Sequence, residues 1–594
     1  MSGDGERQAM DVDIACVGFG PATAGFLTEL SKSLMNPDGS PAIESRVMPG
    51  MPLQVVCYER ADDVGFGVSG VVTRARGIRA SLPDLDFSRI PMAAAVVDEK
   101  VVYLLDPVGA SRRSLSLRMI DRTVRTLRLD RDLGWELPYV PPFLRKDGGV
   151  VLSMGQFMQH VAGEISSSGV VQIWPGMPVA EAFPGATEGS VGGIRLTDQG
   201  AEPGMDIHAA LTVIGDGPVG AVGRQLDERL GMPKGHRHRE WALGMKFVVD
   251  LPEPAELAPG TVWHTIGYPE PEIFGFLYVH PGNVASVGIF VPSWFRSPVR
   301  TAYRYLQHYV THPYLWRRLK GGKLRSWGAK SLEESGRRGE PFLVGDGFAR
   351  IGEGSGSTNV LTGSGVDEAW TTGALLAQAA VRLARDCRPF TRENLERTYV
   401  TLRRSSWVER DSRIAEKSRD GFHRGVVRGM VGMALAGLTR GRLSLGGEPR
   451  PVAGTEEFFA RKIAAAEVRR IVGECRAKGT SSHDALMDAS GWPAIPFDGQ
   501  LLFSQQDALL VGGKVQAPAG FADHVQFRRR DLCEACDVKL CIEMCSGQAI
   551  APGSGGVPAF DREKCVYCGA CVWNCPHAAI AFQAGAGGLH STEN

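Results

Sequence analysis

The chain has 594 residues, and its 66 basic and 66 acidic side chains give a formal charge of zero. The hydrophobic fraction of 43% and the charged fraction of 22% are ordinary for a folded protein, which argues against a disordered, collagen-like or coiled-coil chain. The balanced charge gives no reason to expect a nucleic acid partner. This length allows about four domains.

Cysteine is the unusual part of the composition. Eight of the 12 cysteines lie between Cys533 and Cys575. The first residues, MSGDGERQAMDVDIACVG, lack the basic region and the cleavage site of an export signal, so we expect no signal peptide and a reducing cytoplasm. In that compartment clustered cysteines bind metal more often than they form disulfides. No run reaches the roughly 18 apolar residues of a membrane-spanning helix.

The N-terminal pattern is typical of a dinucleotide-binding domain. A strand over residues 12–17 precedes the turn GFGPATAG, a helix opens at Phe26, and a second strand over 53–58 ends in an acidic residue. Such a turn lets backbone N–H groups approach a pyrophosphate, while the acid accepts from a ribose hydroxyl. Thr23 replaces the third glycine of the motif, which predicts a slightly wider spacing of helix and strand. The cofactor-binding candidates here are Gly18, Gly20, Pro21, Ala22 and Glu59.

The next 230 or so residues alternate helical and extended patterns. We expect a hairpin over 91–105, a charged helix ending near Arg131, a helix over 155–165, and a β-rich layer over 260–292, where short apolar runs alternate with Gly and Pro.

Residues 211–223, LTVIGDGPVGAVG, hold a second glycine motif with two interpretations. It could begin a second, NAD(P)-binding domain, or it could be a strand and Asp-Gly loop that covers flavin. No acidic residue follows at the expected distance, which favours the flavin loop and makes Asp216 and Gly217 binding candidates.

A later strand, over 342–345, ends in Gly345 and Asp346 and is followed by a Gly/Ser/Thr-rich loop and a helix over 366–384. Asp346 could accept from a ribitol hydroxyl, and the helix would aim free N–H groups at the flavin edge where negative charge collects on reduction. Alone, this loop could be a mobile surface feature. Together with the N-terminal turn it predicts an FAD site.

The C-terminal cysteines give the most specific motif. The spacing Cys-x2-Cys-x2-Cys-x3-Cys-Pro from Cys565 to Pro576 matches bacterial ferredoxins, in which the fourth cysteine ligates the other cluster. A similar quartet precedes it, so we expect two [4Fe-4S] clusters. One is predicted to use Cys533, Cys536, Cys541 and Cys575, and the other Cys545, Cys565, Cys568 and Cys571. Zinc bound by isolated CxxC pairs is the alternative, but it leaves the third cysteine of each run unexplained.

Residues 429–439, GMVGMALAGLT, carry no charge and are flanked by Arg424, Arg428, Arg440 and Arg442. Eleven residues are too short to cross a hydrocarbon layer of roughly 30 Å. They could lie in one leaflet with the arginines at the headgroups, or form a buried core helix.

These features together resemble the electron-transfer-flavoprotein:quinone oxidoreductase family over most of the chain. The matching segments are VGFGPATAGFL, Glu59 with Val64-Gly65 and Ser69-Gly70, GTVWHTIGYP, FGFLYVHPG, HPYLWRRLKGGKLRSWGAKSLEESG, GDGF with NVLTGSG and GALLA, and DGQLLFSQQDALLVGG. The resemblance implies FAD contacts at Ser69, Gly70, Thr362 and Gly363 as well. It also implies a monotopic enzyme that passes electrons from soluble electron-transfer flavoprotein to quinone, with 429–439 as the membrane-dipping helix and 91–105 near the quinone entrance.

Two features depart from the family. The family has one cluster, whose ligands correspond to Cys545, Cys565, Cys568 and Cys571, so the other quartet would be an addition. Ser546 stands where the family has proline. An extra cluster changes the route by which electrons arrive, so a ferredoxin-type or other soluble donor remains open.

The expected fold is α/β: a Rossmann-like, glutathione-reductase-type FAD domain, a β-rich quinone or substrate domain and a C-terminal α+β ferredoxin-like domain. The expected boundaries are 11–92, 150–250 and 335–400 for the FAD domain, 93–149 for a quinone and membrane-side segment, 251–334 for the β-rich domain, 401–450 for helices with the membrane contact, 451–520 for a helical linker and 521–585 for the clusters.

The predicted function is electron transfer through clusters and FAD to quinone, on the cytoplasmic side of the inner membrane, with no single acid–base residue at its centre. Two other functions stay open: a flavin reductase of the geranylgeranyl-reductase type, and a non-enzymatic iron–sulfur carrier with a vestigial flavin site.

Overall fold

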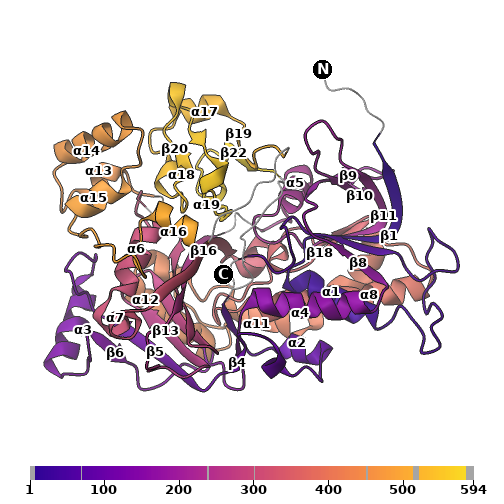
Figure 1. Ribbon diagram of the computed structural model, residues 1–594, viewed down its shortest axis with the longest axis horizontal. Coiled ribbons are helices and arrows are strands. Elements are labelled where there is room, and N and C mark those ends of the chain that lie inside the picture. Colours follow the sequence, from indigo (N-terminus) through magenta and orange to yellow (C-terminus); the bar gives the residue numbers. More distant parts are fainter. Residues whose placement is uncertain are drawn as a thin grey trace.

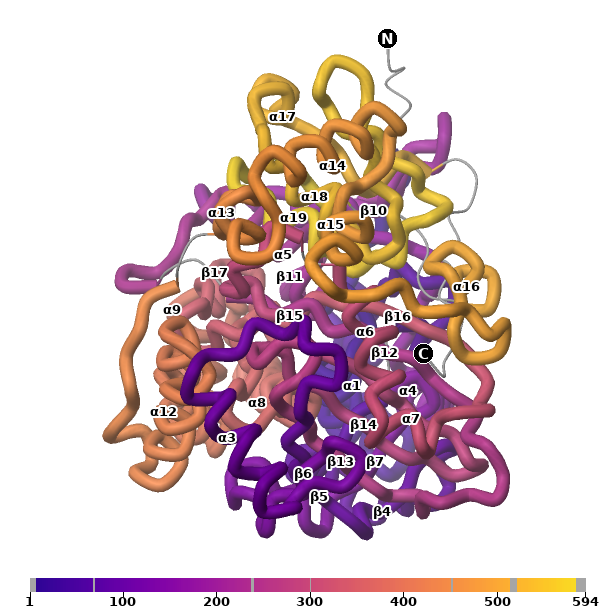
Figure 2. Tube along the Cα trace, turned by 90° about the vertical axis from the view of Figure 1, so that its left-hand side faces the viewer, coloured from indigo at the N-terminus to yellow at the C-terminus, as the bar shows by residue number. Residues whose placement is uncertain are grey.

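The computed structural model describes residues 7–67, 70–236, 240–299, 301–449, 452–512 and 521–583. Figure 1 shows two large sheets beside each other, each covered by helices, with the cysteine-rich tail at the top of the view. Seen from the side in Figure 2, the tail lies over the region where the two sheets meet.

The first sheet carries the predicted nucleotide turn. Its main path runs β17-β18-β11-β1-β2-β8, and β10 and β9 extend it from β11. The strands are β1 (Ala9–Val17), β2 (Val55–Tyr58), β8 (Val171–Trp174), β9 (Val179–Pro184), β10 (Val191–Leu196), β11 (Asp206–Ile214), β17 (Val344–Gly345) and β18 (Phe348–Arg350). β8, β2, β1, β11 and β18 run parallel, so their carboxyl ends meet at one edge.

Both faces of this sheet are covered, which explains why β1 is buried from Val12 to Val17. One face packs against α1 (Pro21–Ser31), α4 (Met154–Ser167) and α8 (Val366–Arg385). On the other face α5 (Ala221–Leu230) packs with β9 and β10.

Two glycines let α1 and α8 approach closely. A Cβ at Gly373 would lie 1.8 Å from the carbonyl oxygen of Ala22, and one at Gly25 would lie 2.4 Å from the carbonyl oxygen of Trp370. The two backbones therefore touch at positions where only glycine fits. This contact fixes the start of α1, which carries the nucleotide turn.

The second sheet has seven strands in the order β16-β12-β15-β14-β13-β5-β6. They are β5 (Asp98–Leu104), β6 (Gly134–Glu136), β12 (Trp241–Asp250), β13 (Thr261–Ile266), β14 (Phe274–His280), β15 (Val284–Pro292) and β16 (Lys323–Glu333). One face packs against α6 (Ala302–Val310) and α7 (Pro313–Leu319). The opposite face packs against a small sheet of β3 (Val71–Thr73), β7 (Val150–Leu152) and β4 (Ala94–Ala95).

Further helices surround the two sheets. They are α2 (Arg76–Ser81), α3 (Leu115–Thr126), α9 (Arg392–Leu395), α10 (Thr401–Ser405), α11 (Trp407–Ala415), α12 (Val426–Leu438), α13 (Thr455–Phe459), α14 (Ala465–Ala477), α15 (His483–Ala489) and α16 (Gln505–Val511). The segment between α14 and α16, expected to be a linker, buries Leu486 and Trp492 in the core of the second sheet.

The tail is a small α+β unit with two similar halves. It pairs β19 (Val525–Phe527) with β22 (Ile580–Phe582) and β20 (Ile550–Ala551) with β21 (Ala559–Phe560), and it contains α17 (Arg530–Ala535), α18 (Leu540–Glu543) and α19 (Ala570–Trp573).

The structure confirms the predicted α/β fold class, the first βαβ unit, the β-rich layer and the helix at 366–384. The expected hairpin at 91–105 is wrong, because β4 joins the small sheet while β5 pairs with β13 in parallel. β12 belongs to the second sheet, so that sheet includes residues 241–250, which we had expected in the flavin domain.

The α1–α8 contact predicts that Gly373→Ala destabilises the protein by about 1–3 kcal/mol, because the new methyl group would overlap the α1 backbone. Gly163→Ala is the matched control: Gly163 is exposed within α4 with no atom within 4 Å of the new Cβ, so it should be neutral or stabilising. Denaturant unfolding of both variants measures this. Equal stabilities would contradict the close contact.

Candidate functional site

The glycine turn after β1 leaves an open space in front of α1. Gly18 has a φ of +82°, and a Cβ there would lie 3.0 Å from the carbonyl oxygen of Gly215. No atom lies within 4 Å of a Cβ at Gly20, and no side chain caps α1 at this residue. Pro21 occupies the first turn, where its missing N–H does no harm. The turn and the uncapped helix end therefore suit an anionic group such as a pyrophosphate.

Glu59 lies beside this turn, as the sequence predicts. Its Oε2 accepts a hydrogen bond from the Phe19 N–H at 2.7 Å, and its Oε1 accepts from the Ala61 N–H at 3.0 Å. A carboxylate has about four acceptor sites, so these two bonds orient Glu59 and leave capacity for a ribose hydroxyl.

Three turns converge at the carboxyl edge of the first sheet. A Cβ at Gly352 would lie 2.8 Å from Cβ of Ala22, and one at Gly354 would lie 2.8 Å from the carbonyl oxygen of Gly217. The turns after β1, β11 and β18 therefore touch one another. Between the two glycines lies Glu353, whose buried Oε1 accepts from the Glu333 N–H at 2.8 Å.

Gly345 and Asp346 lie away from this edge, which corrects the prediction for them. They stand in the hairpin before β18, so the three residues of β18, roughly 10 Å, separate them from the converging turns. The Asp346 carboxylate accepts instead from the Arg392 N–H at 2.7 Å. The acidic residue at the expected end of the strand is Glu353, which the sequence reasoning missed although the signal, a strand followed by Gly-Glu-Gly, is present.

Asp216 acts locally as a helix cap. Its Oδ2 accepts from the Gly223 N–H in the first turn of α5 at 2.8 Å, and burial raises the pKa of its carboxyl group. The neighbouring Gly217 has a φ of +75° and reaches the converging turns through its carbonyl group. Both residues of this predicted pair lie against the other turns, because Cα of Asp216 lies 3.2 Å from a Cβ at Gly18 and the Gly217 carbonyl oxygen lies 2.8 Å from one at Gly354.

The loop before α8 holds Thr362 and Gly363. The Asn359 Oδ1 accepts from the Leu361 and Thr362 N–H groups, both at 3.1 Å, and Gly363 has a φ of +62°. The Thr362 carbonyl oxygen accepts from Nζ of the buried Lys146 at 2.9 Å. No side chain caps α8, so its first N–H groups remain available for an acceptor.

The predicted pair Ser69 and Gly70 is only partly visible, because Ser69 lies outside the described residues. Gly70 has a φ of +89°, and a Cβ there would lie 2.4 Å from Oγ of Ser286 and 3.1 Å from Nζ of Lys246. The loop before β3 therefore touches the second sheet.

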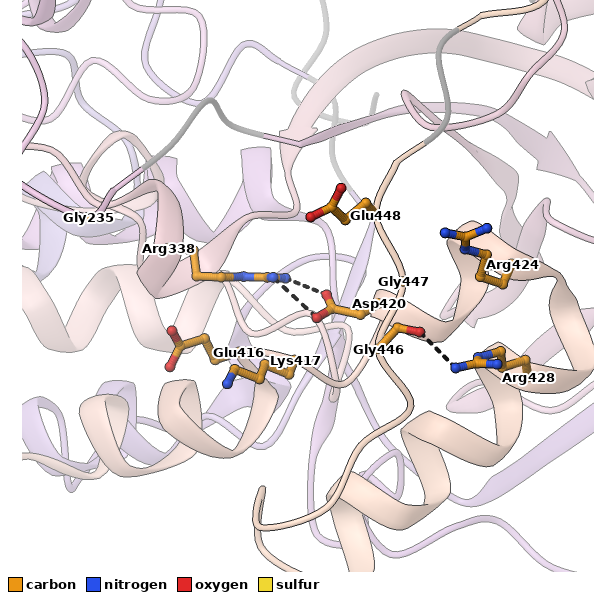
Figure 3. A pocket seen from close by; sticks show the side chains of 10 residues that line it. All are labelled: Gly235, Arg338, Glu416, Lys417, Asp420, Arg424, Arg428, Gly446, Gly447 and Glu448. Carbon is orange, nitrogen blue, oxygen red and sulfur yellow. Dashed lines mark hydrogen bonds and ion pairs between the residues drawn. The ribbon is translucent and has the colours of Figure 1, made fainter.

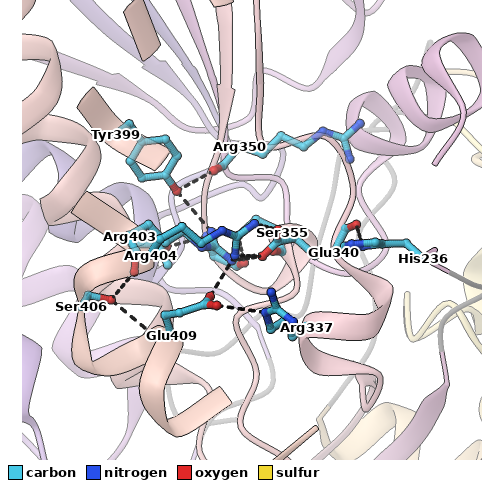
Figure 4. Close-up of polar contacts among 12 residues, drawn as sticks. His236, Arg337, Glu340, Arg350, Ser355, Tyr399, Arg403, Arg404, Ser406 and Glu409 are labelled. Atoms are coloured by element: carbon cyan, nitrogen blue, oxygen red, sulfur yellow. Dashed lines mark hydrogen bonds and ion pairs between the residues drawn. The ribbon is translucent and has the colours of Figure 1, made fainter. Parts of the chain in front are cut away.

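A buried ion-pair network holds the turn after β18 (Figure 4). The Arg403 guanidinium donates to the Ser355 carbonyl oxygen and to its Oγ, both at 2.7 Å, and the Tyr399 hydroxyl donates to the Arg350 carbonyl oxygen at 2.9 Å. Arg404 pairs with Glu340 and bonds Glu409 at 2.8 Å. Helices α10 and α11 thus fix the turn after β18. We call the edge of the first sheet where this turn meets those after β1 and β11 the nucleotide edge.

The tail cysteines that the sequence groups together influence one another's pKa, while their role as cluster ligands stays a prediction. Burial raises the pKa of the Cys541 thiol to about 12, and the neighbouring Cys575, Cys536 and Cys533 add to the effect in that order. Burial raises the pKa of Cys571, with contributions from Cys568, Cys545, Cys565 and Cys541. Each quartet therefore gathers its own thiols, and Cys541 and Cys571 bring the quartets next to each other.

Corresponding backbone N–H groups point at sulfur in the two halves of the tail. The Ala549 N–H donates to Cys545 Sγ at 3.1 Å and the Ala579 N–H donates to Cys575 Sγ at 3.3 Å. His524 adds a ring nitrogen 3.2 Å from Cys565 Sγ. Hydrogen bonds to ligand sulfur are one means by which proteins tune cluster potentials.

No group of three His, Cys, Asp or Glu side chains in the described residues, which include all eight tail cysteines, converges closely enough to hold a single metal ion. A zinc site needs four ligand atoms within about 2.3 Å of one ion.

The tail is docked firmly onto the other domains. Trp573 stacks on Trp241 with ring centroids 3.8 Å apart, and the Ser331 N–H donates to the Cys568 carbonyl oxygen at 2.9 Å. A Cβ at Gly569 would lie 2.2 Å from Cγ1 of Val219, which follows the Asp216–Gly217 turn. The Cys545 quartet thus lies on the side of the tail that faces the flavin domain.

A parallel sheet with an uncapped glycine turn, joined to a ferredoxin-like unit with two thiol quartets, defines the class of iron–sulfur flavoproteins. The comparisons make this specific. Residues 241–332 match the model described as "ETF-QO, ubiquinone-binding", and residues 558–581 match the 4Fe-4S binding domain.

Curated relatives agree. The chain is 26% identical over 391 residues to the probable electron transfer flavoprotein-ubiquinone oxidoreductase of Acinetobacter baylyi, covering 63% of this chain and 62% of the relative. It is also 26% identical to the Pseudomonas aeruginosa enzyme, with 63% and 64% covered, and 25% identical to the Dictyostelium discoideum mitochondrial enzyme, with 72% and 68% covered. The chain thus spans under two thirds of the first two relatives.

Solved structures include a geranylgeranyl bacteriochlorophyll reductase-like protein from Thermoplasma acidophilum, at 16% identity and a TM-score of 0.48, covering 78% of this chain and 99% of that one. The sequence matches carry the comparison: the chain is similar to electron-transfer-flavoprotein:quinone oxidoreductases, the family that its motifs resemble.

The geometry of the nucleotide edge predicts that Glu59→Gln lowers FAD affinity by about ten- to a hundredfold, because a charged acceptor is lost beside the turn. Asp346→Asn, at the other end of β18, should leave FAD affinity unchanged. Flavin titration of the apoproteins measures both. Loss of FAD affinity in Asp346→Asn but not in Glu59→Gln would contradict the placement of FAD beside Glu59 and away from Asp346.

Proposed function

We propose that the protein is a membrane-associated oxidoreductase that passes electrons from electron-transfer flavoprotein, or a similar soluble donor, through two [4Fe-4S] clusters and FAD to a quinone. FAD can exchange electrons singly or in pairs, and so connects one-electron clusters with a two-electron quinone. The converging turns and the loop before α8 would bind FAD. Their residues are Gly18, Gly20, Glu59, Gly217, Gly352 and Gly354 in the turns and Thr362 and Gly363 in the loop.

The docking of the tail is the single observation that carries this proposal. Gly569 contacts the segment just after the Asp216–Gly217 turn, and the Cys568 carbonyl is bonded to β16. Arg60, next to Glu59, lies over the Tyr567 ring at 3.7 Å. The Cys545 quartet thus sits between the nucleotide edge and the other quartet, which supports an electron path from the Cys533 quartet to the Cys545 quartet and then to the flavin.

The quinone would use the second sheet, where the ubiquinone-binding match falls. β5 from the predicted quinone-side segment pairs with β13 of that match, so the two regions form one sheet. This supports the expectation that residues 91–105 lie near the quinone entrance.

The membrane contact would involve α3 and α12, which lie near each other in Figures 1 and 2. α12 buries one side, including Gly429, Met433 and Ala436, and exposes Val427, Val431 and Leu438. The buried side agrees with the core-helix interpretation, and the exposed apolar side chains would serve the membrane contact that we propose. α3 adds exposed Leu115, Met119 and Ile120. In the part of the chain that is described, no helix combines the length and hydrophobicity needed to span a membrane.

A pocket of about 830 Å³ lies at the N-terminal end of α12 (Figure 3). Arg338 pairs with Asp420 at 2.7 Å inside it, and Arg428 donates to the Gly446 carbonyl oxygen at 3.2 Å. Its lining is charged with both signs, which suits neither a quinone ring nor a flavin. Arg424 and Arg428 line this pocket, and their charges would suit a position at the lipid headgroups.

The two-quartet arrangement predicts about eight irons per FAD in the purified protein. Cys541→Ser should reduce this to about four while FAD stays bound, because Cys541 belongs to the quartet farther from the nucleotide edge. Cys387→Ser, an exposed cysteine outside the tail, is the control and should change nothing. Iron and flavin analysis with anaerobic EPR measures this. About four irons per FAD in the unmodified protein would contradict the presence of a second cluster.

The function itself is tested by anaerobic turnover with a chemically reduced donor protein, either electron-transfer flavoprotein or a ferredoxin. We expect one quinone to be reduced for every two electrons supplied, with no saturation of an isoprenoid double bond. Alkene saturation without quinone reduction would favour the geranylgeranyl-reductase type. Iron without FAD in the purified protein would favour a simple carrier.

The membrane surface predicts that the double variant Val431→Ser/Leu438→Ser binds anionic lipid vesicles at least tenfold more weakly, because two exposed apolar side chains no longer enter the lipid. Leu510→Ser is the control, since Leu510 is 83% exposed on α16, away from α12 in Figure 2. Vesicle sedimentation compares them. Equal loss in both variants would exclude α12 as the specific contact.

A further inference from the structure

A buried lysine on the second sheet has no partner among the described residues that could balance its charge. Lys246 lies in the middle of β12, is 2% exposed, and its Nζ has no hydrogen-bond partner among the described residues. Its stem passes over Gly288 of β15, where a Cβ would lie 2.8 Å from Cβ of Lys246. The glycine therefore leaves room for the side chain to lie across the sheet.

The ammonium group points at the loop that enters β3. It lies 3.1 Å from the position of a Cβ on Gly70, and Oγ of Ser286 lies 2.4 Å from the same position. Gly70 is one of the residues expected at the flavin, and it directly precedes β3 of the small sheet that packs on the second sheet. The lysine therefore stands in the second sheet and faces a loop that carries a predicted flavin contact.

The polar neighbours of Lys246 supply no negative charge. The His280 Nδ1 lies 2.9 Å from the Met92 carbonyl oxygen, which can only accept, so Nδ1 carries the proton and Nε2 accepts from the Ser286 hydroxyl at 3.0 Å. Burial lowers the pKa of His280 to about 4, which keeps the ring neutral. The cluster of Lys246, Ser286 and His280 thus contains one potential cation and no anion.

A lysine in this position is unfavourable unless something else binds it. An unpaired buried charge is strongly unfavourable, and burial accordingly lowers the pKa of Lys246 to about 7. A methionine of similar volume would stabilise the fold better. The site therefore suits a ligand that offers acceptor atoms or negative charge at the Gly70 loop.

Resting on the proposed function, in which FAD binds at this interface, we propose that Lys246 contacts the flavin ring and stabilises the negative charge that the ring gains on reduction. The flavin provides carbonyl and ring-nitrogen acceptors in its oxidised form and added negative charge when electrons arrive, and a nearby cation favours the reduced form. Lys246 then sets the flavin potential, and the hydrogen bond between Ser286 and His280 fixes the polar groups beside it.

The test is a spectroelectrochemical titration of bound FAD in Lys246→Met holoprotein, without quinone or donor. We expect the equilibrium to shift at least tenfold toward oxidised flavin, which is a potential about 30 mV lower for a two-electron couple. Lys323→Met, which removes an exposed lysine of the same sheet, should leave the potential unchanged. Lys246→Arg should restore part of the shift, because it keeps the charge.

A separate measurement distinguishes a structural role. The Lys246→Met apoprotein should unfold at the same denaturant concentration as the parent or a higher one. Should Lys246→Met fail to fold, Lys246→Gln is titrated in the same way with the same expectation. An unchanged flavin potential in the folded variant overturns the inference. A change confined to the KM for quinone also overturns it, because the lysine would then act on quinone instead of flavin. Absence of quinone reduction in the unmodified protein would contradict the proposed function while leaving the flavin shift to be judged by itself.

Discussion

The rigid contact between the ferredoxin-like tail and the flavin domain is the constraint on which the rest of the structure depends. Electron transfer weakens steeply with distance, so clusters and flavin must be held close without a flexible joint. The contact of Gly569 with the Val219 side chain joins the tail to the flavin domain, and the Trp573–Trp241 stack joins the tail to the second sheet. The edge of the first sheet, the second sheet and the tail all meet at this interface, which explains why the nucleotide turns, β12 and α19 contribute to one surface.

Local motifs were predictable from the sequence. The turn at Gly18 and Gly20, the acid Glu59 at the end of β2 and the cysteine spacing each need only a short stretch of chain, since the chemistry of phosphate or thiolate binding dictates residue types at fixed offsets. The crossing of Cys545 and Cys575 between the two halves of the tail was likewise predicted from spacing, and neighbouring thiols of each predicted quartet raise one another's pKa.

Features that depend on distant pairing were not predictable. Asp346 and Glu353 both follow short apolar runs, and only the β17–β18 hairpin decides which of them reaches the nucleotide edge. β5 pairs with β13, which lies about 160 residues later in the chain. The sequence pattern of β5 is equally consistent with a local hairpin. Lys246 stands in an otherwise apolar strand, a signal visible in the sequence, but its burial without a partner depends on the loop at Gly70 and on Gly288 of the neighbouring strand.

Stopped-flow spectroscopy of the holoprotein tests the central claim most directly, namely that tail and flavin exchange electrons within one chain. The clusters are reduced by a short pulse of chemical reductant, and flavin absorbance is followed at several protein concentrations. The account predicts a rate of flavin reduction that is independent of protein concentration. A rate that rises in proportion to protein concentration would mean that electrons pass between separate molecules, and would contradict it.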